Sequence, residues 1–191
     1  GLLIGVVRTI PKSKKKGVRG WQKIGEVLLA AYIEIFRGTP MMVQAMVIYW
    51  GYAFATGGRT LNLMVSAIFI VSINTGAYIA EIVRGGISGI DKGQFDGARS
   101  IGMGHFAAMR YIVLPQVLRS ILHAVSNELV SNIKDTSVLN VIGFTELYFF
   151  TNVIVKQTYK NFPIYFICCV IYFILTFVIT RIIKLIEKKI S

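Results

Sequence analysis

Long uncharged segments are the feature that most constrains what this chain can fold into. Residues 38–58, 60–80 and 164–180 contain no Asp, Glu, Lys or Arg. About 20 residues of helix cross a hydrocarbon layer roughly 30 Å thick, and the usable range is about 17–25 residues. Only 16% of the 191 residues are charged, whereas an average soluble domain has about 25%. The sequence therefore predicts an all-α, polytopic helical membrane protein.

The distribution of basic residues predicts which loops face the cytoplasm. The formal net charge of +12 by itself is compatible with nucleic-acid binding. Lys and Arg gather in alternate loops, however, as the positive-inside rule describes for membrane proteins. We therefore expect no nucleic-acid partner and a cytoplasmic C-terminus. The basic residues of the predicted cytoplasmic segments are Arg8, Lys12, Lys14, Lys15, Lys16, Arg19, Lys23, Arg84, Lys92, Arg99, Arg110, Arg181, Lys184, Lys188 and Lys189, whereas the opposite loops hold only Arg59, Lys156 and Lys160.

The order of apolar segments predicts about five transmembrane helices in a single domain, residues 1–191. The N-terminal apolar segment ends near Arg8, and we interpret it as the tail of a helix whose beginning is missing from this chain. The amphipathic segment 21–40 suits an interfacial or intersubunit helix. Pro40 begins or kinks the next span, because it cannot donate an amide hydrogen bond. That span reaches about Thr56.

The second half of the chain predicts three further membrane-associated helices after a span at about 60–83. Pro115 lies just inside the start of the fourth helix, where a missing amide costs least. The aromatic segment 144–163 is typical of an outer interfacial helix. The last span covers 163–180 and leads into the basic tail.

The loop at about 84–114 is much longer than a tight turn between two spans requires. Gly102 and Gly104 allow a bend in its middle, and its apolar residues follow roughly helical spacing. The structural interpretation is a helix that lies on the membrane surface. The functional interpretation is a docking element for another protein. The apolar residues concerned are Ala98, Ile101, Phe106, Met109 and Ile112.

This loop resembles the EAA signature of bacterial ABC importer permeases, and the spacing of the signature matches throughout. Asp replaces Glu and Gly replaces Ala at its first two positions, which keeps the charge but weakens helix propensity. Four further segments, FRGTP with Val43-Gln44, NTGAYIAEIVRGGI, KGQFDGA and IKDTS, resemble the polar amino acid permeases of the His/Glu/Gln/Arg type. The matching positions of the signature are Asp96, Gly97, Ala98, Gly102, Ile112, Leu114 and Pro115.

The resemblance implies a five-helix permease subunit of an ATP-driven importer of polar L-amino acids. It implies a homodimer or pseudo-dimer in the bacterial cytoplasmic (inner) membrane, and an extracellular or periplasmic substrate-binding protein that delivers the amino acid. A coupling helix at about 91–106 would dock into a cytoplasmic ATP-binding cassette subunit. The residues expected to couple to that ATPase are Asp96, Gly97, Ala98, Gly102, His105, Leu114 and Pro115.

The chain contains no G-x-x-x-x-G-K-[ST] phosphate loop, so we expect it not to be an enzyme and to have no cofactor of its own. ATP and Mg²⁺ would belong to the partner ATPase. His105 and His123 are isolated in the sequence, and we expect no metal site.

Charged residues interrupt the apolar segment NELVSNIKDTSVL at 127–139. A charge at a helix centre costs about 2.5–3.5 kcal/mol on the insertion scale, and each Leu, Ile or Val returns only about 0.3–0.6 kcal/mol. Three charges therefore must face protein or a water-filled cavity. In a helix, Glu128 and Asp135 lie seven residues apart and share a face, whereas Lys134 belongs to a neighbouring stripe.

Two interpretations of these charges stay open. Lys134 pairs with Glu128 or Asp135 to hold helices together, or the carboxylates meet a ligand's ammonium or cationic side chain. Thr136 and Ser137 favour a helix break, because their hydroxyls compete for backbone hydrogen bonds. For Gln44, Asn74 and Tyr78, hydrogen bonding between helices is the alternative to contact with the substrate. The substrate residues that the resemblance and the charge pattern suggest are Gln44, Asn74, Tyr78, Glu128, Lys134, Asp135, Thr136 and Ser137.

The alternative function is an ion-coupled secondary amino acid transporter that uses Glu128, Lys134 and Asp135 as a relay. This alternative does not explain the long loop at about 84–114. The excess negative charge of 127–139 favours a zwitterionic or cationic amino acid over an anionic one. Arginine, lysine, histidine, glutamine and cystine all remain candidates.

Overall fold

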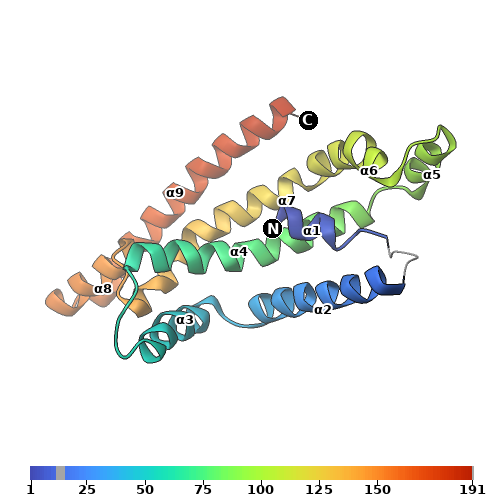
Figure 1. The fold of residues 1–191 in the computed structure, drawn as a ribbon. Helices are drawn as coiled ribbons and strands as arrows, with labels where there is room; N and C mark the ends of the chain where they lie inside the picture. Colours follow the sequence, from blue (N-terminus) through green and yellow to red (C-terminus); the bar gives the residue numbers. More distant parts are fainter. Residues whose placement is uncertain (12–15, 191) are drawn as a thin grey trace.

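The computed structural model describes residues 1–11 and 16–190, and every element in them is helical (Figure 1). The predicted all-α class is confirmed. Lys12, Lys14 and Lys15 of the predicted basic loop lie outside the described residues, and so does the side chain of Lys16.

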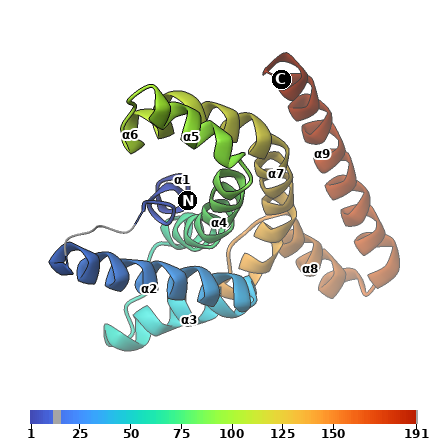
Figure 2. The same cartoon turned by 90° about the vertical axis from the view of Figure 1, so that its right-hand side faces the viewer.

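Two long helices form the centre of the bundle, α4 (Leu63–Ser88) and α7 (Leu114–Asp135). Their contact forms an apolar core in which Val83 of α4 packs with Val117 of α7 and with Val113, which directly precedes α7. The short helix α1 (Leu2–Val7) lies against the other side of α4 (Figure 2). Gly5 permits this close approach, because a Cβ there would lie 2.6 Å from the Cβ of Val83.

Helix α2 (Lys16–Gly38) contains most of the amphipathic segment 21–40 that suits an interfacial or intersubunit helix. One face of α2 packs along α4, where Ile33 is buried against Ala77 and Ala80. The Tyr32 hydroxyl donates to the carbonyl oxygen of Ile73. The opposite face of α2 is exposed. The amphipathic pattern was therefore correct, but the apolar residues on one face meet a neighbouring helix.

Helix α3 (Met41–Ala55) begins directly after the Thr39–Pro40 link and lies beyond the end of α2 (Figure 1). At 15 residues it is shorter than the roughly 17 residues that a crossing needs. Helix α3 alone is therefore not among the helices long enough to cross, and a span from Pro40 to about Thr56 stays a prediction. The Thr39–Pro40 link separates α3 from α2, so the two helices follow each other along the chain with a short interruption.

The described residues contain two helices that are long and apolar enough to cross a membrane, α4 and α9 (Asn161–Ile190). A third crossing is possible if the run from His105 to Ile142 is taken with α8 (Leu147–Thr158), although the two are bent by 55°. The total of about five crossings remains a prediction. Helix α8 lies in the segment predicted as an outer interfacial helix, and α9 continues beyond the predicted span into the basic tail.

The central loop folds into α5 (Lys92–Ser100) and α6 (His105–Ala108), followed by a π-helical turn, η1 (Met109–Val113). The predicted bend is present, and Gly102 adopts φ +81°. Pro115 lies just inside the start of α7, as predicted, and η1 joins α6 to α7 without a break. A proline inside a helix clashes with the carbonyl four residues earlier, and a wider π turn accommodates it.

Candidate functional site

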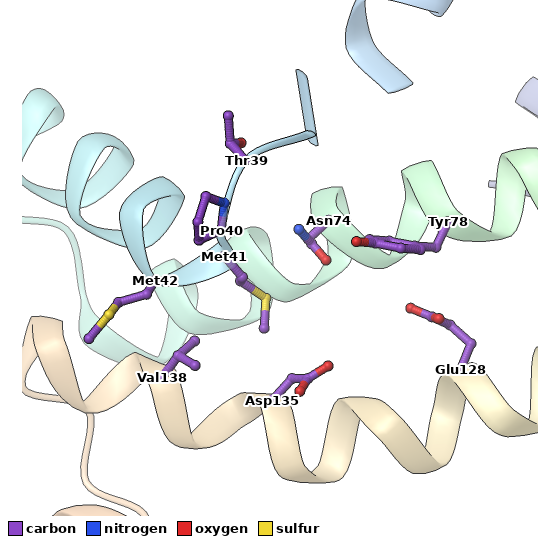
Figure 3. A pocket seen from close by; sticks show the side chains of 9 residues that line it. All are labelled: Thr39, Pro40, Met41, Met42, Asn74, Tyr78, Glu128, Asp135 and Val138. Carbon is purple, nitrogen blue, oxygen red and sulfur yellow. The ribbon is translucent and has the colours of Figure 1, made fainter. Parts of the chain in front are cut away.

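A cavity of about 330 Å³ lies between α4, α7 and the link from α2 to α3. Figure 3 shows Glu128 and Asp135 of α7 on one side, opposite Asn74 and Tyr78 of α4. The carboxylates therefore lie on the same helix face, as their seven-residue spacing predicted. The complete lining is Thr39, Pro40, Met41, Met42, Asn74, Tyr78, Glu128, Asp135 and Val138.

The helices on two sides of this cavity are interrupted or change geometry beside it. On one side, α2 stops at Gly38 and α3 starts at Met41. On the other side, α7 ends at Asp135 and continues as a 3-10 helix, η2 (Thr136–Ile142). The predicted break at Thr136 is confirmed. Helices that change geometry beside a cavity are where many transporters place their ligand sites.

The two carboxylates have no ion-pair partner among residues 1–11 and 16–190. Glu128 is half-buried and Asp135 is exposed to the cavity. Two like charges that share a cavity repel each other, and a cation between them relieves this repulsion. The site is therefore suited to a positively charged ligand group.

Lys134 does not occupy the position expected for the partner of these carboxylates. Its side chain is exposed, does not line the cavity, and forms no ion pair in the described part of the chain. Lys134 precedes Asp135 by one residue, which rotates it by about 100° around the helix. The predicted pairing of Lys134 with Glu128 or Asp135 is absent from this structure.

The predicted substrate residue Gln44 has structural partners instead. Its Nε2 donates to the carbonyl oxygens of Phe36 and Thr39 at 2.9 and 2.8 Å. Its Oε1 accepts from Nδ2 of Asn74 at 2.9 Å. Gln44 is buried and does not line the cavity, so interhelical hydrogen bonding describes its position. Asn74 forms an interhelical hydrogen bond and also lines the cavity, so it can hold the helices together and contact a ligand.

Thr136 and Ser137 mark the helix break but do not line the cavity. The Thr136 hydroxyl donates to the carbonyl oxygen of Ile133. Thr136 instead borders a second, apolar cavity of about 300 Å³ beside α4. One turn before the break, the Thr75 hydroxyl donates to Oδ1 of Asn132 at 3.1 Å and joins α4 to α7. The structure therefore separates the residues that shape the break from those that face the cavity.

Several residues of the site were not predicted from the sequence. Thr39, Pro40, Met41, Met42 and Val138 form much of the wall. Arg37 lies beside it, with Cζ 5.4 Å from the ring centroid of Tyr78. The segment FRGTP, which contributed only to the resemblance, is the signal that could have located Arg37 and Thr39.

Most of the predicted coupling residues lie in α5, α6 and the turn between them, at one end of the bundle (Figure 1), whereas Leu114 and Pro115 begin α7. Ala98 is buried, whereas Asp96, Gly97, Gly102 and Pro115 are exposed and Leu114 is half-buried. The His105 ring stacks on Phe95, with centroids 6.2 Å apart. The described residues contain no group of three His, Cys, Asp or Glu side chains arranged to hold a metal ion.

Ile101, directly after α5, and Phe106 in α6 are exposed apolar residues, and each side chain is 76% exposed. Ala98 and Met109 are buried instead, so the apolar residues of the loop are not all in the same environment. Exposed large apolar side chains on adjacent short elements are typical of a surface that another protein covers.

Comparison with known proteins agrees with this arrangement. The family model described as "Binding-protein-dependent transport system inner membrane component" matches residues 16–191. The chain belongs to this family. Inner membrane components of this kind are membrane-spanning transport subunits, in agreement with the helical fold and the apolar spans.

Full-length similarity to transport permeases supports the same assignment. The chain is 35% identical over 190 residues to the putative glutamine transport system permease protein GlnP of Rickettsia felis, covering 99% of this chain and 84% of that protein. It is 34% identical over 189 residues to the glutamine transport system permease protein GlnP of Escherichia coli strain K12, covering 99% and 82%.

Solved structures show the same fold. A crystal structure of an amino acid ABC transporter with histidines superposes with a TM-score of 0.81 at 34% identity, covering 98% of this chain and 84% of that chain. The MetNI methionine ABC transporter in an inward-facing conformation superposes with a TM-score of 0.76 at 18% identity, covering 100% and 85%. The second comparison concerns the fold alone.

Proposed function

We propose that this inner membrane component is the permease subunit of an ATP-driven importer of polar L-amino acids. The observation that carries the proposal is the cavity in which the carboxylates of Glu128 and Asp135 face Asn74 and Tyr78. The glutamine permease relatives and the amino acid transporter structure support this substrate class.

The chemistry of the cavity suits the ammonium end of an amino acid. An ammonium group buried in a low-dielectric site needs a charged or hydrogen-bonded partner. Glu128 and Asp135 supply two carboxylates, and the oxygens of Asn74 and Tyr78 lie across the cavity. A volume of about 330 Å³ falls within the range of small-molecule pockets. Basic and neutral polar amino acids, including arginine, lysine, histidine, glutamine and cystine, fit this charge pattern.

The turn between α5 and α6 is the proposed contact with a cytoplasmic ATP-binding cassette subunit. Ile101 and Phe106 offer exposed apolar anchors, and the EAA-like residues Asp96, Gly97 and Ala98 lie on the preceding helix. Because η1 and α7 follow this turn without a break, movement of the turn reaches Glu128 and Asp135 through a continuous helix. ATP and Mg²⁺ would bind to the partner, and its hydrolysis cycle would alternate access to the cavity.

A second permease copy and an extracellular or periplasmic substrate-binding protein complete the proposed transporter. With α5 and α6 facing the cytoplasmic ATPase, the basic C-terminal end of α9 also lies in the cytoplasm, as the positive-inside rule requires.

The test is uptake of radiolabelled L-glutamine and L-arginine into liposomes that contain this permease, its ATPase and its binding protein. We expect uptake of at least one of them with ATP inside, and none with a non-hydrolysable analogue. Uptake by the permease alone, driven by a sodium or proton gradient, contradicts the proposal and supports the secondary transporter.

A further inference from the structure

Arg37 occupies a fixed position at the edge of the cavity. It lies in the last turn of α2, directly after Phe36 and two residues before Thr39. The carbonyl oxygen of Phe36 accepts hydrogen bonds from Nε2 of Gln44 at 2.9 Å and Nδ2 of Asn74 at 3.3 Å. These bonds hold the end of α2 against α3 and α4, so the backbone that carries Arg37 is anchored on both sides.

The Arg37 side chain extends toward α4 and the cavity. Its Cζ lies 5.4 Å from the ring centroid of Tyr78, a residue of the cavity wall. A guanidinium over an aromatic face is attracted by the negative charge of the ring's π system. Glu128, the half-buried carboxylate of α7, lies opposite Tyr78 across the cavity (Figure 3).

Unlike Arg8 and Arg84, Arg37 has guanidinium donors that are unoccupied in the described part of the chain. Arg8 and Arg84 both bind the carboxylate of Glu81, one turn of α4 beyond Tyr78. Arg37 forms no hydrogen bond or ion pair within the described ranges, and its guanidinium lies over the Tyr78 ring. A guanidinium has five N–H donors in a planar fork that matches a carboxylate with two parallel bonds.

The cavity wall itself contains two carboxylates and no basic residue. A free amino acid carries a carboxylate beside its ammonium group, and Glu128 and Asp135 would repel that carboxylate. A cation at the cavity edge removes this conflict. We propose that Arg37 binds the α-carboxylate of the transported amino acid, while Glu128 and Asp135 bind its cationic groups. This inference rests on the proposed function, and it makes the cavity selective for molecules that carry both charges.

The experiment compares each amino acid with the amine that lacks its carboxylate. Equilibrium binding of L-arginine and agmatine, and of L-glutamine and 4-aminobutanamide, is measured on the complex of permease and ATPase without the binding protein. The variants are Arg37→Gln and Arg37→Lys. Arg19→Gln is the matched control, because Arg19 lies near the other end of α2 and does not line this cavity.

We expect the wild-type complex to prefer the amino acid to its amine by about tenfold or more, since charge-assisted hydrogen bonds are the strong ones. Arg37→Gln should remove this preference by weakening amino acid binding alone, and Arg37→Lys should restore part of it. Arg19→Gln should leave both affinities unchanged. An Arg37→Gln variant that binds both ligands as the wild type does, or loses both equally, overturns the proposal.

Uptake driven by ATP in the same wild-type preparation tests the proposed function separately. Normal uptake together with an unchanged preference in Arg37→Gln contradicts only the role of Arg37. Absence of ATP-driven uptake contradicts the proposed function itself.

Discussion

Nδ2 of Asn74 donates a hydrogen bond of 2.9 Å to Oε1 of Gln44, and this buried bond joins α4 to α3 beside the cavity. Gln44 in turn donates to the carbonyl oxygen of Phe36 in the last turn of α2 and to that of Thr39 in the Thr39–Pro40 link. The two amides therefore connect three helices at the point where the path from α2 to α3 is interrupted. Their arrangement fixes the position of one wall of the cavity.

Gln44→Leu should lower the thermal stability of the permease, because it removes the side-chain donor to the Thr39 carbonyl, one of the two acceptors of Asn74 Nδ2 and one of the two side-chain donors to the Phe36 carbonyl. An unsatisfied buried polar group costs about 1–3 kcal/mol. The measurement is the unfolding temperature in detergent. Gln157→Leu on the exposed surface of α8 is the control and should cause little change. Equal unfolding temperatures for the two variants would show that the amide cluster has no stabilising role.

Gly5→Ala should weaken the contact of α1 with α4. The added Cβ would lie 2.6 Å from the Cβ of Val83 and 2.7 Å from the carbonyl oxygen of Ala80. Such overpacking costs about 1–3 kcal/mol, and it should appear as a lower unfolding temperature. Gly51→Ala in α3 meets nothing within 4 Å and should stabilise the helix by up to about 1 kcal/mol. The account of this contact fails if both variants shift the unfolding temperature in the same direction.

Phe106→Ala and Ile101→Ala should weaken association with the ATPase subunit. Both side chains are exposed and apolar, and truncation of an interface anchor commonly costs about 2 kcal/mol or more, or roughly thirtyfold in affinity. Co-purification and ATP-driven uptake are the measurements. Phe162→Ala, also exposed but at the start of α9, is the matched control and should retain both. Normal association of the Phe106 and Ile101 variants would place the ATPase contact elsewhere.

The sequence predicted the parts of this structure that depend on composition and simple periodicity. The uncharged segments within 60–80 and 164–180 are in α4 and α9, the two helices that fit a crossing. The seven-residue spacing of Glu128 and Asp135 placed both on the cavity face of α7. The local competition of a Thr hydroxyl for backbone bonds was also sufficient to locate the break at Thr136.

Other features depend on tertiary packing, which periodicity does not encode. An apolar stripe on α2 has the same sequence pattern whether it meets lipid headgroups or Ala77 and Ala80. Lys134 carries the opposite charge to its neighbour Asp135, but one step along a helix directs it elsewhere. Gln44 was predicted near the substrate, and its actual partners are backbone carbonyls that come into reach only when α2 and α3 fold against each other.

Ligand binding by variants of the α7 carboxylates tests the central claim most directly. Equilibrium binding of L-arginine and L-glutamine is measured on the complex of permease and ATPase with Glu128→Gln, Asp135→Asn or Lys134→Gln. Loss of a charge partner costs the ligand about 1.5–3 kcal/mol, so each carboxylate variant should bind the transported amino acid about tenfold or more weakly. Lys134→Gln should bind it normally, because Lys134 lies outside the cavity. Normal binding by both carboxylate variants, or a selective loss in Lys134→Gln, would contradict the account.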